Sequence, residues 1–222
     1  MRIKTAIAVM CGVAALASGA ANAGDVGFSA RIGPTVGGYN LKVTGGGTSS
    51  TSNGTVYGAQ TGVTLAAGDA FADFGLDLMQ VNTDTDFKRT DYTLLGGYNV
   101  TSMFGAFAGY RIGQESDSFF KSESSSTGKW LEKGPFIGGS VGGIEMGPVR
   151  MNGSFSYNFN KLDVGGSSTL SYPGFSIKIG AGLASLPAHS LQIRYQDFKA
   201  DESGVKFEES YLQLIYLYRF TI

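Results

Sequence analysis

The residues best suited to chemistry in this chain are a single histidine, His189, and two neighbouring carboxylates, Asp84 and Asp86. A histidine held beside a carboxylate can act as a general base in the hydrolysis of a peptide or ester bond. His189 lies in a short turn segment, whereas the carboxylates lie in a long polar segment, and the strand order given below places these segments at opposite ends of the molecule. Serine-rich segments add no nucleophile by themselves, because serine is common in any solvated loop. We therefore predict no catalytic site and no enzymatic activity.

The chain also offers little to a metal ion or a cofactor. It has one cysteine and one histidine, whereas zinc sites need several such ligands at close spacing. Asp84, Asp86 and Asp91 could chelate calcium weakly, but a solvated acidic loop is the simpler interpretation of this segment. We predict that the protein carries no metal and no cofactor.

The chain ends on a segment, 209–222, in which large apolar residues recur at every second position. Side chains of a strand alternate between two faces, so the segment is predicted to be a strand with one apolar face. A soluble edge strand would avoid such a face, which must therefore contact another sheet or lipid. The residues of this face are Leu212, Leu214, Tyr216, Tyr218, Phe220 and Ile222.

Residues 1–23 have the pattern of a secretory signal peptide. Arg2 and Lys4 precede an apolar run over residues 6–16, and an Ala-Asn-Ala cleavage pattern ends at Ala23. The run is shorter than the roughly 20 residues that a spanning helix needs. We predict cleavage after Ala23, export, and a mature domain over residues 24–222. The only cysteine, Cys11, leaves with the leader, so the mature domain has no disulfide.

The composition narrows the possible partners. The chain has 17 Lys and Arg residues against 18 Asp and Glu, and two of the basic residues lie in the leader. A slightly acidic mature chain argues against nucleic acid as a partner. The chain combines 34 glycines with 12% aromatic residues. This combination is ordinary in a membrane barrel, where glycines allow close packing and aromatics gather at the membrane interfaces.

Ten segments with period-two alternation fill the mature chain, and the connections between them alternate between long and short. Long polar connections are predicted at 44–54, 82–90, 114–133, 161–172 and 199–208, and short turns near residues 68, 101, 147 and 186. Outer-membrane barrels have an even number of strands, short periplasmic turns and longer external loops. We predict an all-β, antiparallel up-and-down transmembrane barrel of ten strands. Eight strands are the alternative, if two segments pair outside the membrane.

The first segment, 26–43, changes its apolar parity along its length. Phe28 and Ile32 lie on one parity, whereas Tyr39 and Leu41 lie on the other. A bulge in the Pro-Thr-Val-Gly-Gly stretch, 34–38, would produce this switch.

In this architecture the chain resembles small outer-membrane β-barrel proteins, the class that contains OmpA-type domains, OmpX-like proteins and opacity-type proteins. The resemblance covers the whole mature chain and concerns architecture rather than a motif. It implies an assembly signal in the final strand, and hence the barrel-assembly machinery and outer-membrane lipid as partners. The strand must also close against the first one, because an open sheet edge is not tolerated in a bilayer. The residues of the assembly signal are Tyr216, Tyr218, Phe220 and Ile222.

A soluble up-and-down barrel, such as a lipocalin-like carrier, is the competing fold. There the apolar face points inward and the polar face meets water. The segments at 149–160 and 175–183 carry almost no charge on their apolar parity, which includes Tyr and Phe residues suited to membrane girdles. Charged residues make up only 16% of the chain, fewer than is usual for a soluble domain. The sequence favours the membrane barrel.

Seven charged residues fall at positions that are predicted to face the lumen. Charges in a narrow barrel are costly unless they are paired or hydrated. We expect Asp73 and Asp77 to pair with Arg31, Arg194 or Arg219, because closure makes strands one, nine and ten neighbours. Such pairs would fill the lumen, and a small cation-lined pore is the alternative. The seven residues are Arg31, Asp73, Asp77, Arg111, Lys178, Arg194 and Arg219.

The longest predicted loop contains three aromatic residues, Phe119, Phe120 and Trp130. We interpret them as interfacial anchors, with a partner-binding set as the alternative. The predicted function is that of a non-enzymatic outer-membrane protein with a role in envelope structure or in surface interaction or adhesion through its external loops. The alternative function is a narrow, porin-like channel for small solutes. The sequence names no ligand.

Overall fold

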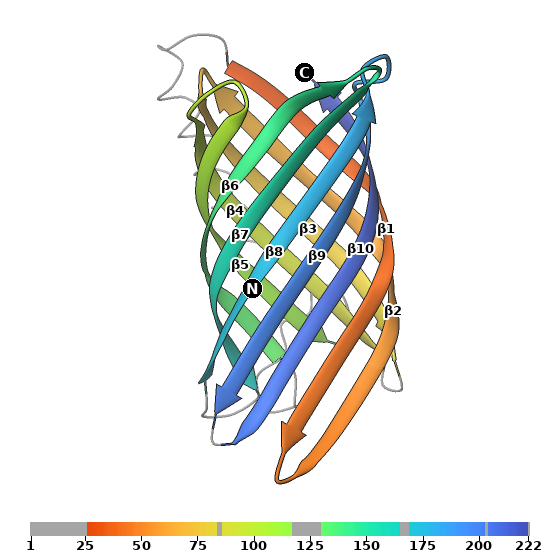
Figure 1. Cartoon of the computed structure of the whole chain (residues 1–222), viewed down its shortest axis with the longest axis vertical. Coiled ribbons are helices and arrows are strands. Elements are labelled where there is room, and N and C mark those ends of the chain that lie inside the picture. Colours follow the sequence, from red (N-terminus) through yellow and green to blue (C-terminus); the bar gives the residue numbers. More distant parts are fainter. Residues whose placement is uncertain (1–25, 84–85, 117–129, 165–168, 203, 222) are drawn as a thin grey trace.

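The computed structural model describes residues 26–83, 86–116, 130–164, 169–202 and 204–221 (Figure 1). The predicted leader, together with Asp84, Phe119, Phe120 and Ile222, lies outside the described residues. Among the described residues no helix is long and apolar enough to cross a membrane.

The described chain folds as ten antiparallel strands in one closed barrel, which confirms the predicted fold and strand number. Each strand pairs with its sequence neighbours, and the last strand pairs with the first, so the sheet has no open edge. The strands are β1 (Val26–Gly45), β2 (Thr48–Ala67), β3 (Ala70–Asn82), β4 (Phe87–Asn99), β5 (Phe104–Ser116), β6 (Trp130–Met146), β7 (Val149–Val164), β8 (Thr169–Leu183), β9 (His189–Glu202) and β10 (Val205–Thr221).

The two ends of the barrel differ. One end, here the turn end, carries the short connections at 68–69, 100–103, 147–148 and 184–188. The other, here the extended end, carries the far ends of the β1–β2 and β9–β10 hairpins, which project from the lower edge of the barrel in Figure 1. In outer-membrane barrels the short turns face the periplasm, so we expect the turn end to face the periplasm.

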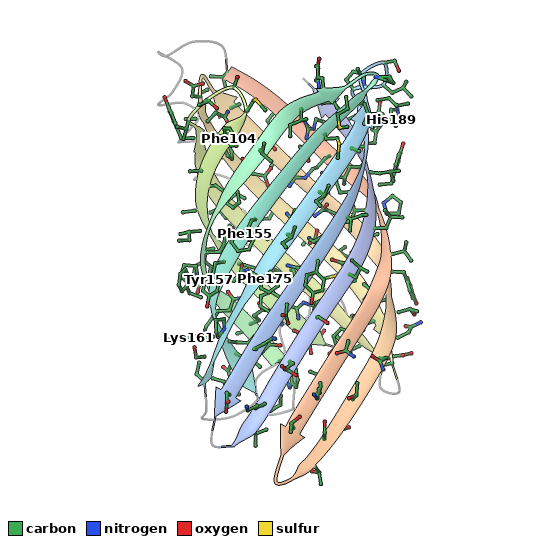
Figure 2. All side chains as sticks on the ribbon, viewed as in Figure 1. Phe104, Phe155, Tyr157, Lys161, Phe175 and His189 are labelled. Carbon is green, nitrogen blue, oxygen red and sulfur yellow. The ribbon has the colours of Figure 1, made fainter. Side chains whose placement is uncertain are left out.

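An apolar belt surrounds the turn-end half of the barrel. On β1 the outward side chains remain apolar from Val26 to Val36, and on β7 they remain apolar from Val149 to Phe159. Each stretch matches the 9–11 residues that a tilted strand needs to cross the hydrocarbon core. Figure 2 labels Phe155 and Tyr157 of this belt on β7. The barrel therefore has the outer surface of a membrane-spanning protein.

The pattern reverses beyond the belt. At the extended end the outward side chains are polar, beginning with Lys161 on β7 (Figure 2) and Asn40 on β1. Exposed ion pairs join Lys42 to Glu208 at 3.9 Å and Lys206 to Asp201 at 3.5 Å. The interior at this end is apolar, whereas the interior within the belt is polar. This arrangement, apolar inside and charged outside, is that of a protein surface in water.

Three of the predicted long loops, at 44–54, 161–172 and 199–208, are largely strand. β1 and β2 each have 20 residues and are joined through Gly46 and Gly47 alone. Both glycines have positive φ, 59° and 81°, a backbone conformation that two-residue hairpin turns require and that other residues rarely adopt. The prediction of loops was wrong because polar Ser, Thr and Gly residues can pair as strands in water when an apolar interior supports them.

The predicted bulge in β1 is absent. The pairing of β1 with β2 runs without a shift from Val26–Ala67 to Gly45–Thr48. Tyr39 and Leu41 therefore keep the inward parity of Arg31, and they pack in the apolar interior of the extended end. The change in sequence pattern reflects the change from lipid to water outside the strand, since no side chain changes its face. The one register shift in the described ladders lies in glycine-rich β6, between Val141 and Ile144.

Candidate functional site

Charged and polar side chains fill much of the interior of the barrel. Their ion pairs and hydrogen bonds form three successive levels, starting from the turn end. Nearest the turn end, Arg31 on β1 forms a bidentate pair with Asp73 on β3, with N–O distances of 2.5 and 2.8 Å. Thr64 of the intervening strand donates to the same carboxylate at 2.5 Å. Bidentate guanidinium–carboxylate pairs are among the strongest and most directional hydrogen bonds in proteins.

The next level joins distant strands. Arg194 Nη1 on β9 donates to Asp77 Oδ2 on β3 at 2.5 Å, and Arg194 Nε donates to Gln213 Oε1 on β10 at 2.7 Å. Gln213 in turn donates to the sulfur of Met79 at 3.0 Å. Arg194 is 4% exposed and Asp77 6%. The chain of contacts crosses the lumen and fixes these side chains at its centre.

Arg89 on β4 is the centre of the third level and is 1% exposed. Its guanidinium donates to Asp91 at 2.9 Å and to Glu115 at 3.1 Å on its own side of the barrel. It also donates to Glu132 on β6, and to the hydroxyl of Tyr211 on β10 at 3.1 Å. A buried charge is tolerated only when its hydrogen-bonding groups are satisfied, and all three nitrogens of Arg89 have partners.

The carboxylates around Arg89 also accept hydrogen bonds from other side chains. Glu209 accepts hydrogen bonds from the hydroxyls of Tyr211 at 2.7 Å and Tyr172 at 3.0 Å. Asp91 accepts from Arg111 Nη2 at 2.5 Å. Glu132 accepts from the amide of Asn160. Four acidic and two guanidinium groups thus form one buried network, here called the Arg89 network: Arg89, Asp91, Arg111, Glu115, Glu132 and Glu209.

A glycine makes room for the Arg89 network. A Cβ atom at Gly113 on β5 would lie 2.6 Å from both Arg89 Nη2 and Asp91 Oδ1. Because these atoms belong to a fully buried ion pair, they have no free space into which they could move. The close packing of the Arg89 network therefore requires glycine at position 113.

Two apolar clusters cover the network toward the extended end. The first contains Val56, Met79 and Val81, none of them more than 1% exposed, and it includes Tyr39 and Tyr211. The second is formed by Leu162, Tyr172, Phe198 and Ala200, with Trp130, Leu170 and Phe207 packed against it. Together they fill the interior of the barrel beyond the membrane belt.

Trp130 belongs to this interior, so its assignment to an external loop was wrong. It opens β6 and faces inward, with its ring 6.0 Å from that of Phe207 in a T-shaped arrangement. Loop length misled the prediction, because β6 begins earlier than its alternating pattern suggests. The described residues say nothing of Phe119 and Phe120.

On the turn-end side of the Arg89 network lies a polar cavity of about 470 Å³. It reaches the turn end, since Asn99, the last residue of β4, and Ser102 of the β4–β5 connection line it. Lys178 and Arg219 also line this cavity, and neither forms an ion pair within 4 Å among the described residues. Arg219 is exposed at the mouth, beside a smaller cavity of about 110 Å³.

The structure thus divides the seven predicted lumen charges. Arg31, Asp73, Asp77 and Arg194 form two ion pairs, and Arg111 joins the Arg89 network. Sequence reasoning did not single out Arg89, Glu115 or Glu132, because their segments were interpreted as external loops. Glu209 was not singled out either, although it opens the predicted final strand, 209–222. The interpretation of Asp91 as part of a solvated acidic loop was wrong, because Asp91 is 2% exposed and accepts hydrogen bonds from two arginines. The signal that could have found Arg89 and Asp91 is the in-phase alternation of residues 87–91 with the rest of β4.

His189 lies at the turn end, as Figure 2 shows, far along the barrel from the carboxylates of the extended end. Its Nδ1 is 2.5 Å from the hydroxyl of Tyr216, and its ring packs against Tyr218. Within the described residues no group of three or more His, Cys, Asp or Glu side chains could hold a metal ion. His189 therefore contributes to the aromatic surface at the end of the belt.

The final strand presents its apolar face outward. Tyr216, Tyr218 and Phe220 are 39%, 36% and 45% exposed on the outer surface of β10. The backbone of β10 closes the barrel against β1 from Ser29–Thr221 to Thr44–Lys206. The closed antiparallel sheet, the even strand number and the apolar belt are together the architecture of an outer-membrane β-barrel.

Comparison with known proteins gives structural likeness only. No family model matches the chain, and none of the curated proteins matches it. Among solved structures, the outer membrane protease OmpT from Escherichia coli is 12% identical, with a TM-score of 0.49 over 88% of this chain and 97% of that one. The β domain of the Bordetella autotransporter BrkA is 13% identical, with a TM-score of 0.46 over 84% and 98%. Neisserial surface protein A is 13% identical, with a TM-score of 0.35 over 87% and 97%. At such identities no residue role is carried over to this chain.

Proposed function

We propose that this chain is a non-enzymatic integral protein of the outer membrane, closed to solutes, that presents a rigid strand extension at the cell surface. The observation that carries the proposal is the Arg89 network, which joins β4, β5, β6 and β10 across the interior. A conducting lumen would place these groups in water, where their exposed fractions would be far above the observed 1–2% for Arg89, Asp91, Glu132 and Glu209.

The extension supports a role in envelope structure or surface interaction. β1 and β2 are 20 residues long, about twice the 9–11 residues that crossing requires. Their distal parts are held by side-chain hydrogen bonds, such as Asn40 to Asn53 at 2.5 Å. Such a hairpin exposes both polar side chains and a fixed backbone to a partner, and needs little ordering on binding.

Two features support the absence of enzymatic activity. The chain has one histidine, and it lies at the turn end, where it packs in an aromatic cluster on the outer surface. Toward the opposite end, the buried carboxylate of Glu209 accepts hydrogen bonds from Arg89 and from two tyrosine hydroxyls. A general base must come within hydrogen-bond reach of a proton on its substrate. Asp91, Glu132 and Glu209 of the Arg89 network are only 1–2% exposed and already accept hydrogen bonds from other side chains.

Planar-bilayer recording tests the closure. The refolded protein is expected to give no reproducible conductance steps. Stable, reproducible steps from the unmodified protein would contradict the proposal.

Cysteine labelling on intact cells tests the location and the orientation. If the leader is removed after Ala23, the mature chain has no cysteine, so a single introduced thiol is the only target. Ser50→Cys, on the extension, is expected to react with a membrane-impermeant maleimide. Ser102→Cys, at the turn end, is expected to react only after permeabilisation, and the reverse result would contradict the orientation.

A narrow channel is the second candidate, because the cavity of about 470 Å³ already occupies the turn-end half of the lumen. A channel would require the Arg89 network and the apolar clusters to move aside. The bilayer recording separates the two candidates.

A further inference from the structure

The cavity at the turn end has two unlike walls. β8, β9, β10 and β1 are consecutive in the barrel and supply its cationic wall. β3, β4, β5 and β6 supply the opposite wall, here called the apolar wall for its aromatic side chains, although Asp73, Asp77 and Arg111 also project from it. The cationic residues are Lys178, Arg194, Arg219 and Arg31, and the apolar residues are Phe71, Leu95, Phe107 and Phe136.

The cationic wall contains two pairs of like charges that are directly opposed on neighbouring strands. Lys178 pairs in register with Arg194, and Arg31 pairs in register with Arg219. Like charges in this position destabilise a sheet. Asp77 and Asp73 each neutralise one member of a pair, Arg194 and Arg31 respectively. Lys178 and Arg219 form no ion pair within 4 Å among the described residues, so the wall retains an excess of positive charge.

Buried hydrogen-bonding groups on this wall also lack partners. Arg194 Nη2 and Ser176 Oγ have no hydrogen-bond partner within the described part of the chain, although both residues line the cavity. Their residues are only 4% and 6% exposed. An unsatisfied buried polar group costs stability, so two such groups beside an unpaired lysine point to a ligand that accepts hydrogen bonds and carries negative charge.

The apolar wall is fixed by glycines. The ring of Phe71 occupies the space where Gly97 would carry a Cβ atom, and the ring of Phe136 occupies the corresponding space at Gly109. A Cβ at Gly138 would likewise lie 2.5 Å from the ring of Phe107. The rings therefore lie against the backbone of the neighbouring strand, and Phe107 and Phe136 pack edge to face at 71°. This packing holds the aromatic side of the cavity in place.

We propose that this cavity binds a small organic carboxylate from the periplasmic side. The apolar body packs against Phe71, Phe107 and Phe136, and the carboxylate accepts hydrogen bonds from Lys178 and Arg194. Arg219 at the mouth raises the local concentration of anions. The volume, about 470 Å³, lies within the range of small-molecule sites. This inference goes beyond the proposed surface function and holds whether or not the barrel conducts.

Calorimetric titration of the full refolded barrel in a zwitterionic detergent tests the site. The probe is naphthalene-2-carboxylate, with its neutral amide and acetate as matched controls. The carboxylate is expected to bind, and the amide and acetate each to bind at least tenfold more weakly, because they lack the head group or the body. Equal binding of the amide would overturn the anionic site, and equal binding of acetate would overturn the role of the aromatic wall.

Variants locate the binding. Lys178→Gln is expected to weaken binding of the carboxylate about tenfold, because it removes a charge-assisted hydrogen bond to the head group. Arg219→Gln is expected to weaken binding several-fold, because it removes a positive charge at the mouth. Lys206→Gln, an exposed lysine at the extended end, is the matched control and is expected to bind as the parent does. If Lys178→Gln does not fold, Arg219→Gln provides the test of the site. Arg219 is exposed at the mouth, so its replacement should not prevent folding. Parent-like binding by a folded Lys178→Gln or, in that case, by Arg219→Gln would overturn the proposal.

Discussion

Arg194 on β9 and Asp77 on β3 form an ion pair across the lumen, with 2.5 Å between Arg194 Nη1 and Asp77 Oδ2. Three strands, β2, β1 and β10, separate their strands along the barrel wall. The pair therefore connects two parts of the wall that share no backbone hydrogen bond. Together with Arg31–Asp73 and the Arg89 network, it makes the interior a second source of cohesion besides the sheet itself.

Removing the acidic members of the two pairs is expected to destabilise the barrel. Asp73→Ala with Asp77→Ala leaves Arg31 and Arg194 beside Lys178 without compensation, and breaking a buried pair costs about 3–5 kcal/mol, less where water enters. The temperature of the heat-modifiability transition on gels should fall. Asp201→Ala, which removes an exposed ion pair, should leave that temperature nearly unchanged. A double variant that melts like the parent would show that these charges are hydrated independently.

Gly113→Ala is expected to be destabilising although it adds a single methyl group. The new Cβ would lie 2.6 Å from Arg89 Nη2 and Asp91 Oδ1, and overpacking of this kind costs about 1–3 kcal/mol. Urea-induced unfolding in lipid vesicles measures the loss. Gly38→Ala is the matched control on the outer face of β1, because a Cβ at Gly38 meets nothing within 4 Å. If both substitutions have equal effects, the Arg89 network is not tightly packed around Gly113.

Trp130 allows a spectroscopic test, because it is the only tryptophan in the chain. Packed against Phe207 inside the barrel, it should give blue-shifted emission that aqueous acrylamide quenches poorly. Phe207→Ala should shift the emission to the red and increase quenching. Red-shifted, easily quenched emission from the unmodified protein would place Trp130 in a solvated loop after all.

A charged side chain should lower the free energy of unfolding far more when it is placed on the membrane belt than when it is placed on the extension. Ile193 lies in the outward row of β9 and is 52% exposed on the apolar surface. Ile193→Arg is expected to lower the free energy of unfolding in vesicles by about 2–4 kcal/mol, the cost of a basic side chain near the bilayer midplane. Asn53→Arg, on the polar outer face of the extension, should cost less than about 0.5 kcal/mol. Equal costs would mean that the belt is misplaced along the barrel.

The sequence by itself determined the class of fold. The alternation in β7, β8, β9 and β10 has period two, and a row of apolar side chains as long as a membrane crossing has one stable environment on the outside of a closed barrel. The same parity placed Arg31, Asp73, Asp77 and Arg194 on the inside. These inferences are local, because the period of a strand depends only on the geometry of its own backbone.

Only the tertiary structure showed where the membrane-spanning part of the barrel ends and which side chains close its lumen. Tyr39, Trp130 and Tyr172 looked out of phase or loop-bound in the sequence, because the outside of a strand changes from lipid to water along its length while its inward face stays the same. The Arg89 network draws its members from β4, β5, β6 and β10. Which charge meets which depends on barrel closure, strand register and side-chain reach, and no single segment of the chain encodes those quantities.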